Sequence, residues 1–220
     1  ECHVPDWAKN LSQDERNEAQ IAYMTQVVER YKDNKAIKYW QVENEPFLEL
    51  FAYEHCGELD VDFLDKEIAL VHELDPSRQI IITDSGNLGM WSDAYKRGDI
   101  FGTSVYVHFW NPELGQFRTL LPSWIYRVKA NYNALVYGDK PTFLIELSAE
   151  PWLVAPVATV PIETQFTRMD LDKFNDILKY AEDTRFDQQY LWGAEWWYWL
   201  NEKGYPEHWD RARELYKNSP

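Results

Sequence analysis

Apolar residues recur at helical spacing in several stretches of the chain. Residues 13–31 show this spacing, and Ser12 followed by Glu15 is the pattern of a capping box, in which the two side chains satisfy each other's backbone N–H groups. We therefore expect a helix over residues 13–31. The same spacing predicts further helices over residues 60–74, 90–97, 121–133, 170–181 and 209–217.

Short apolar runs of the β-strand type stand between these helices. They begin near residues 37, 79, 100, 141 and 190, with the third running to residue 110 and the last to residue 199, and a sixth strand is expected to end near Val4. Strands that alternate with helices form βαβ units and a parallel sheet, so the sequence predicts an α/β fold. We take residues 1–220 as one domain, because this length allows a substantial core.

Two of the predicted strands end on a glutamate. The first run stops at an Asn-Glu-Pro turn that contains Glu45, where proline cannot continue a sheet ladder, and the fourth run stops at Glu146. Alternation along the first strand places Glu43 on the same face as Glu45. Two such strands, separated by βα units, put both carboxylates on one rim of the sheet. Glycoside hydrolysis requires such a pair of carboxyl groups.

Composition and charge exclude other classes of function. The net charge of −15 and the absence of a basic stripe argue against nucleic-acid binding, which needs clustered Lys and Arg. No apolar run is long enough to span a membrane, and the spacing of Cys and His residues is not that of a zinc site. Two cysteines leave the redox compartment, and with it the localisation, undecided. The 11 Trp and 14 Tyr residues supply flat rings for a core or for stacking on sugars.

The ordered set of motifs resembles a known family. Asn44-Glu45-Pro46 at one strand end, Glu146 at a later one and a Trp-rich last strand are similar to the clan of retaining (β/α)8-barrel glycoside hydrolases, which contains cellulases, mannanases, xylanases and β-glycosidases. The resemblance implies that Glu45 is the acid/base, Glu146 the nucleophile and Asn44 a ligand of the sugar 2-hydroxyl. Glu150 is the alternative nucleophile, because its Glu-Pro pair imitates the first motif.

The resemblance also sets an expectation for the fold. A closed barrel of this type has eight strands, and the sequence predicts five with the end of a sixth. The chain is therefore expected to be a TIM-barrel domain truncated at the N-terminus, running from about the end of strand three through helix eight. The fold expectation carries a cost, since an open parallel sheet exposes unpaired edges.

Further residues are assigned to the substrate on the same resemblance. Tyr106 and His108 have strand spacing, so both are expected to face one pocket. Trp196 or Trp197, at the end of the last predicted strand, resembles the sugar platform of the family, and alternation puts Trp196 on the face of Trp192 and Tyr198. For most individual Trp residues a place in the core is the competing interpretation. Trp110 and Trp152 follow strands that end at the predicted site and are expected to line further subsites.

The sequence thus predicts an enzyme that hydrolyses β-glycosidic bonds in oligo- or polysaccharides by a retaining double displacement. No metal or organic cofactor is implied, and the expected partner is a carbohydrate rather than nucleic acid or a membrane. The alternatives are a glycan-binding barrel relative without catalysis and an inactive barrel fragment. A Rossmann-type enzyme is disfavoured because no glycine-rich loop follows any predicted strand. The sugar, the linkage, endo or exo action and the oligomeric state are left open.

Overall fold

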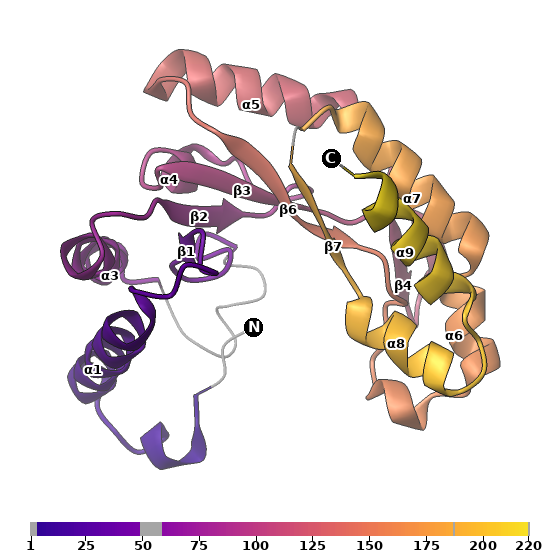
Figure 1. The fold of residues 1–220 in the computed structure, drawn as a ribbon, viewed down its shortest axis with the longest axis horizontal. Helices are drawn as coiled ribbons and strands as arrows, with labels where there is room; N and C mark the ends of the chain where they lie inside the picture. Colours follow the sequence, from indigo (N-terminus) through magenta and orange to yellow (C-terminus); the bar gives the residue numbers. More distant parts are fainter. Residues whose placement is uncertain (1–3, 49–58, 187, 220) are drawn as a thin grey trace. The chain divides into compact units, whose positions relative to one another are not determined.

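The computed structural model describes residues 4–48, 59–186 and 188–219 as strands alternating with helices (Figure 1). The strands of the main sheet follow the order β1-β2-β3-β6-β7. This confirms the predicted α/β fold with parallel strands. By its internal contacts the chain divides into two units, the first with Glu1–Thr103 and Lys129–Phe143, and the second with Ser104–Val128 and Leu144–Pro220. Each unit is described by itself. The aromatic residues of the stretch 47–58 predict an irregular loop, and most of this stretch lies outside the described residues.

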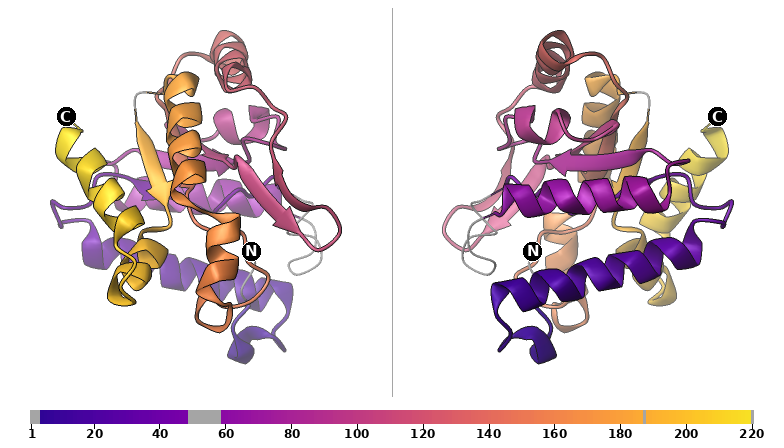
Figure 2. Two further views of the ribbon diagram at one scale, coloured as in Figure 1. Left: turned by 90° about the vertical axis from the view of Figure 1, so that its right-hand side faces the viewer. Right: turned by 90° about the vertical axis from the view of Figure 1, so that its left-hand side faces the viewer.

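The first unit holds three parallel strands and the helices that connect them. Its elements are η1 (Asp6–Ala8), α1 (Gln13–Tyr31), β1 (Trp40–Gln41), α3 (Val61–Leu74), β2 (Ile80–Asp84), α4 (Ser92–Tyr95) and β3 (Ile100–Val105). β2 pairs in parallel with β1 on one side and with β3 on the other. Helices α1 and α3 run side by side (Figure 2).

Local sequence signals fix the two long helices of this unit. The Ser12 hydroxyl accepts the backbone N–H of Glu15, and the Glu15 carboxylate accepts the backbone N–H of Ser12, so the predicted capping box is present. Asp60 caps α3 by accepting the N–H of Phe63. Both helices therefore begin where the sequence predicts.

Strand β2 is buried along its whole length, which explains its apolar run. Asp84 at its end is also buried and accepts the backbone N–H of Trp91 at 2.9 Å. Trp91 is itself fully buried and holds a left-handed φ of 76°. A Cβ atom at Gly89 would lie 2.3 Å from Asp84 Oδ1, so this close approach of backbone to carboxylate requires glycine.

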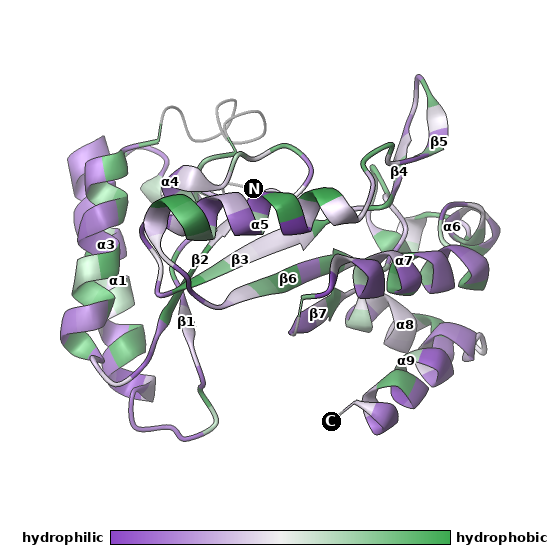
Figure 3. Ribbon diagram, turned by 90° about the horizontal axis from the view of Figure 1, so that it is seen from above, coloured by the Kyte–Doolittle hydropathy of each residue, from purple (hydrophilic) through white to green (hydrophobic). Residues whose placement is uncertain are grey.

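The second unit combines a parallel strand pair, an antiparallel hairpin and several helices. Its elements are β4 (His108–Asn111), β5 (Gly115–Arg118), α5 (Trp124–Tyr137), β6 (Thr142–Ser148), η2 (Val157–Thr159), α6 (Ile162–Arg168), α7 (Leu171–Thr184), β7 (Gln189–Trp192), α8 (Ala194–Glu202) and α9 (Glu207–Asn218). Three elements, β3, α5 and β6, each have residues in both units. β6 and β7 pair in parallel, and β4 and β5 form the antiparallel hairpin (Figure 3). Among the described residues, no helix is both long and apolar enough to cross a membrane.

Three strand predictions were wrong in extent. The last strand was expected to run to residue 199, but β7 ends at Trp192 and α8 follows. Gly193 ends the strand with a φ of 127°, and Trp196, Trp197 and Leu200 then share the buried face of a helix. The strand expected over residues 100–110 ends at residue 105, and the hairpin replaces its second half. The first strand is reduced to the two residues of β1.

Candidate active site

Glu45 lies in the first unit, in the turn that follows β1. Its backbone N–H donates to the Thr83 hydroxyl at 2.8 Å, which ties the turn to the neighbouring strand β2. The Gln41 amide donates to Asn44 Oδ1 at 3.0 Å and to the Glu43 carbonyl at 3.1 Å. Thus the predicted Asn-Glu-Pro motif is a hydrogen-bonded turn at the carboxyl end of a parallel strand.

The backbone of this turn differs from the predicted strand. Glu43 and Glu45 both have positive φ angles, 57° and 47°, a conformation that non-glycine residues adopt rarely and mostly where surrounding contacts impose it. Strand alternation therefore ends before Glu43, and the expectation that Glu43 shares a face with Glu45 by strand parity was wrong. The Glu43 carboxylate is instead held by Gln20 of α1, at 2.7 Å.

Gln20 joins two carboxyl groups in this unit. Its amide nitrogen donates to Glu43 Oε1 and, at 2.6 Å, to Glu67 Oε1 on α3. Glu67 is 2% exposed. Burial and the nearby charge of Glu43 raise the pKa of Glu67 to about 8, against the opposing effect of the Gln20 hydrogen bond. Glu67 is therefore mostly protonated at neutral pH and can share a proton with its neighbours. Sequence reasoning did not find this residue, which lies within an ordinary amphipathic helix.

Glu146 lies in the second unit, near the carboxyl end of β6. The Tyr106 hydroxyl donates to Glu146 Oε2 at 3.1 Å. Burial raises the pKa of the Glu146 carboxyl above its usual value, and the Tyr106 hydrogen bond offsets part of that rise because it favours the charged form. Tyr106 and Glu146, both predicted site residues, are thus in direct contact.

Aromatic rings surround this contact within the second unit. The Tyr106 ring lies 5.5 Å from the Trp152 ring and 6.2 Å from the Phe109 ring, centroid to centroid. Phe109 is also 5.9 Å from Trp152. Trp152 therefore packs against the tyrosine that donates to Glu146. Phe109 was not predicted as a site residue, although its place between His108 and Trp110 was a usable signal.

His108 has a different environment from Tyr106. Its Nε2 atom lies 2.9 Å from Asp176 Oδ2 of α7, and Arg118 donates to the same carboxylate. Burial lowers the pKa of His108, while Asp176 acts in the opposite direction. The strand spacing that was expected to turn Tyr106 and His108 toward one pocket is broken, because β3 ends at Val105 and a new strand begins at His108.

Trp110 and Trp152 are linked through one arginine. The Arg168 guanidinium lies 3.6 Å above the centre of the Trp110 ring, and its NH1 group donates to the Trp152 carbonyl at 2.9 Å. A cation over an aromatic face is an attractive contact. Arg168, on the short helix α6, thus holds the loop of Trp152 against the hairpin that carries Trp110. Sequence analysis did not predict α6.

Trp196 is buried, with 2% of its surface exposed, and its indole N–H donates to Gln165 Oε1 at 2.6 Å. A ring with this environment belongs to the core in this structure. Trp192 at the end of β7 is 50% exposed, and its indole N–H donates to Glu150 Oε1 at 2.8 Å. Trp192 is the tryptophan of this region that offers a ring face, and it was not singled out from the sequence.

The two candidate nucleophiles, Glu146 and Glu150, differ in their place on the backbone and in their hydrogen-bond donors. Glu146 is part of β6 and accepts a tyrosine hydroxyl, whereas Glu150 follows the strand and accepts the Trp192 indole. Burial raises the pKa of the Glu150 carboxyl, and the charge of Glu195 raises it further, while the Trp192 hydrogen bond lowers it. Burial therefore raises the pKa of both carboxyl groups; Glu146 lies within β6, at the register shift between Leu144 and Leu147, whereas Glu150 lies beyond the strand.

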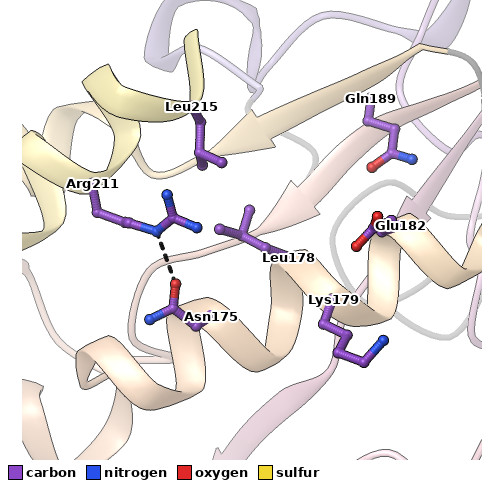
Figure 4. Close-up of a pocket in the computed structure, with 7 residues that line it drawn as sticks. All are labelled: Asn175, Leu178, Lys179, Glu182, Gln189, Arg211 and Leu215. Atoms are coloured by element: carbon purple, nitrogen blue, oxygen red, sulfur yellow. Dashed lines mark hydrogen bonds between the residues drawn. The ribbon is translucent and has the colours of Figure 1, made fainter. Parts of the chain in front are cut away.

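A separate pocket lies on the helical side of the second unit (Figure 4). Arg211 of α9 donates to Asn175 Oδ1 of α7 across it, at 2.9 Å. The lining residues are Asn175, Leu178, Lys179, Glu182, Gln189, Arg211 and Leu215. None of the predicted site residues lines this pocket, and Glu182 is the carboxyl group in its lining, so it does not supply the pair that hydrolysis requires.

Comparison with known proteins identifies the fold. No family model and no curated protein matches the chain. Solved structures do match: a β-glucuronidase of Bacteroides uniformis, at 13% identity and a TM-score of 0.54, over 86% of this chain and 21% of that one. B. uniformis β-glucuronidase 2, covalently bound to cyclophellitol-6-carboxylate aziridine, matches at 16% identity and a TM-score of 0.54, over 86% and 22%. The GH53 catalytic domain of Ignisphaera aggregans matches at 18% identity and a TM-score of 0.52, over 89% and 59%.

The chain therefore spans less than two thirds of each of these proteins. At these identities the likeness shows a shared fold: an α/β arrangement, found in glycoside hydrolases, that is consistent with part of a (β/α)8 barrel.

Proposed function

We propose that residues 1–220 belong to the catalytic domain of a retaining glycosidase that hydrolyses β-glycosidic bonds in oligo- or polysaccharides. The observation that carries the proposal is the Glu146 carboxylate, which accepts the Tyr106 hydroxyl beside a cluster of aromatic rings. A fold shared with glycoside hydrolases supports it. A positioned carboxylate next to flat rings is suited to attack on a sugar.

In the first step, the Glu146 carboxylate attacks the anomeric carbon and a carbon–oxygen ester bond forms. The glycosidic bond breaks, and Glu45, which begins protonated, gives its proton to the leaving oxygen. Tyr106 holds Glu146 in place and favours its charged form before attack. This mechanism requires the two carboxyl groups to be about 5–5.5 Å apart in the working enzyme.

In the second step, Glu45 accepts a proton from a water molecule whose oxygen attacks the same carbon. The ester bond breaks, Glu146 leaves as a carboxylate and Glu45 is protonated again, so that both groups return to their starting states. Asn44, adjacent to Glu45, is proposed to bind the 2-hydroxyl of the sugar. Trp152 and Trp110 are proposed to line subsites.

Identification of the nucleophile tests this proposal most directly. The protein is assayed with a panel of 4-nitrophenyl β-D-glycosides and then with a 2-deoxy-2-fluoro glycoside that traps the glycosyl-enzyme. We expect the label on Glu146, and a loss of kcat of about a thousandfold or more for Glu146→Gly with recovery by azide. The matched variant Glu195→Gly, an exposed glutamate of α8, should keep its activity. A label on Glu150, or azide rescue of Glu150→Gly alone, would reverse the assignment.

The second candidate function is glycan binding without hydrolysis. It is favoured by the exposed aromatic rings, since Trp152 is 39% exposed and sugars can stack on such rings without reacting. In that case neither Glu45→Gln nor Glu146→Gln should weaken glycan binding, and the unaltered protein should leave every glycoside of the panel intact. Separately, Trp196 keeps its proposed role in substrate binding only if its buried indole becomes accessible when a sugar binds, and a rise in its chemical oxidation on addition of the sugar would reveal this.

A further inference from the structure

The β4–β5 hairpin has two chemically different faces. Cross-strand pairing places Phe109 opposite Phe117, and His108 opposite Arg118. Because side chains alternate along a strand, the two phenylalanines share one face, while the histidine and arginine share the other. The Phe109 and Phe117 rings are nearly parallel, with an angle of 11° and a centroid distance of 5.2 Å. One face of the hairpin therefore carries the two stacked phenylalanines, and the other carries the His108–Arg118 pair together with Trp110.

The His108–Arg118 pair binds the hairpin to helix α7. Arg118 donates to both Asp176 oxygens, at 2.8 and 3.1 Å, and His108 Nε2 lies 2.9 Å from the same carboxylate. A two-pronged arginine–carboxylate contact fixes orientation as well as distance. At the tip, Asn111 Oδ1 accepts the N–H of Leu114 at 2.6 Å, which closes the turn. Contacts with Asp176 thus anchor the base of the hairpin, and the Asn111 hydrogen bond closes its tip.

The aromatic face continues the ring cluster that begins at the Glu146 carboxylate. Tyr106 bonds Glu146, its ring is stacked with Phe109 at an angle of 28°, and Phe109 is stacked with Phe117. Phe117 remains 38% exposed at the far end of this row, so its ring is open to a ligand. The row therefore connects a flat apolar surface, through Tyr106, to the carboxylate proposed to attack the sugar.

We propose that the Phe109–Phe117 face is the binding site for the leaving group of the substrate, and that it selects glycosides whose leaving group is an aryl ring. This inference rests on the proposed function for the position of the cleaved bond. It assigns Phe117 as the residue that sets specificity and Phe109 as its support.

The chemistry of the rings decides in favour of the leaving group over the cleaved sugar. The cleaved sugar carries hydroxyl groups on several sides, and each loses free energy if it is removed from water without a hydrogen-bond partner. Phe109 and Phe117 carry no hydrogen-bonding atom in their side chains. They can hold a ring only by an apolar face, which suits an aryl group.

The test measures binding in a Glu146→Gln background, where turnover is prevented. Calorimetry compares phenyl with methyl β-D-glycosides, using the glucoside, galactoside, mannoside and glucuronide. We expect the phenyl compound of the best-bound sugar to bind about 3- to 10-fold more tightly than the methyl compound, and Phe117→Ala to remove that preference. Phe117→Leu, which keeps the apolar bulk without the flat ring, should also lose most of it.

Gln116→Ala serves as the matched control, because it lies next to Phe117 on the opposite face of the same strand and should keep the phenyl preference. Hydrogen exchange over residues 108–118 verifies that each variant retains the hairpin. Equal binding of phenyl and methyl glycosides, a preference that survives in both Phe117 variants, or no binding of any glycoside would overturn the inference. The protein could show a phenyl preference that depends on Phe117 and yet hydrolyse no glycoside. That result would support the binding face and refute the proposed hydrolysis.

Discussion

The Tyr106 hydroxyl donates a hydrogen bond to Glu146 Oε2 at 3.1 Å, linking the loop after β3 to strand β6. A donor aimed at a carboxylate stabilises the charged form and so lowers its pKa, here against the effect of burial. The same contact fixes the direction of the carboxyl group. Tyr106 is therefore well placed to control both the ionisation and the aim of the proposed nucleophile.

Replacement of Tyr106 by phenylalanine should separate these effects from packing. In Tyr106→Phe the pKa of Glu146 rises, so a larger fraction is protonated and inactive at low pH, and the acidic limb of the pH profile of kcat/KM should move to higher pH. We expect kcat/KM at the optimum to fall about 10- to 100-fold, as for other lost catalytic hydrogen bonds. Tyr190→Phe, which removes an exposed hydroxyl bonded to Gln188, is the control and should leave the profile unchanged.

Replacement of two tryptophans near the end of the parallel sheet should have very different effects on the free energy of unfolding. Trp196 is 2% exposed and bonded to Gln165, so Trp196→Ala should lower the free energy of unfolding by about 3–5 kcal/mol. Trp192 is 50% exposed, so Trp192→Ala should lower it by about 1 kcal/mol or less.

Glycoside affinity provides the second readout for this pair. Trp192→Ala removes an exposed ring and the indole donor to Glu150, and it should weaken binding about 3- to 10-fold by calorimetry. Weakened binding in Trp196→Phe, with unfolding by urea unchanged, would instead restore the sequence-based assignment of Trp196 to the sugar.

Local signals account for the parts of the fold that the sequence predicts well. Helices α1 and α3 begin at side-chain caps, Ser12 and Asp60, which act within one turn. Strand β2 is recognisable because it is buried on both faces and therefore continuously apolar. These features need no knowledge of distant residues.

The mispredicted parts depend on single backbone positions or on distant partners. The aromatic stretch after Trp192 has strong strand character, but the positive φ of Gly193 turns the chain into α8, where tertiary packing overrides propensity. His108 seemed to continue a strand with Tyr106, yet its partner Asp176 is 68 residues away. The Asn111-Pro112 pair and Gly115 were the turn signals that identify the hairpin.

In the candidate site too, local sequence signals predict some residues, while others depend on partners that are distant in the sequence. Glu146 was predicted because it ends an apolar run, and Tyr106 because of its strand spacing to His108 and the family resemblance. Glu67 and Phe117 were not found, since neither belongs to a motif, and each matters through a neighbour on another element or strand: Gln20 for the first and Phe109 for the second. Only the folded chain brings such pairs together.

Glu67 should make stability depend on pH. Its folded pKa of about 8 lies above the ordinary value of 4.5, so between these values the folded state holds a proton that the unfolded state has released. The stability due to this group is therefore complete below pH 4.5 and is lost as pH rises through about 8. We expect the loss to amount to about 2–4 kcal/mol.

Glu67→Gln should remove this dependence, because an amide oxygen can still accept from Gln20 without titrating. Urea unfolding at several pH values between 5 and 9 gives the free energy of unfolding of both proteins. Subtracting one from the other cancels the contributions of the other titratable groups. Glu18→Gln is a suitable comparison, as Glu18 is exposed on α1, and it should follow the unaltered protein. If the free energies of unfolding of Glu67→Gln and the unaltered protein change with pH in parallel, Glu67 is charged in the folded state.

His208 should give a pH dependence of the opposite sign. Its ring is 2% exposed and lies 4.9 Å from the Trp196 ring and 5.6 Å from the Phe174 ring. Burial lowers the pKa of His208 below its usual value, although the backbone of Asp170 and Met169 and the negative charges of Glu207 and Asp170 act in the opposite direction. The unfolded state then binds a proton that the folded state does not, so stability falls as pH drops below about 6.5.

His208→Phe tests this dependence, because phenylalanine fills an aromatic site without titrating. Any cost of fitting the larger ring is the same at every pH, so the informative quantity is the change in unfolding free energy between pH 8 and pH 5. We expect the unaltered protein to lose about 1–2 kcal/mol more than His208→Phe over this interval, measured by urea unfolding. His72 is partly exposed on α3, and His72→Phe should lose as much stability as the unaltered protein. An equal loss in His208→Phe would mean that protonation of His208 does not oppose folding, and that the ring reaches water or a partner when charged.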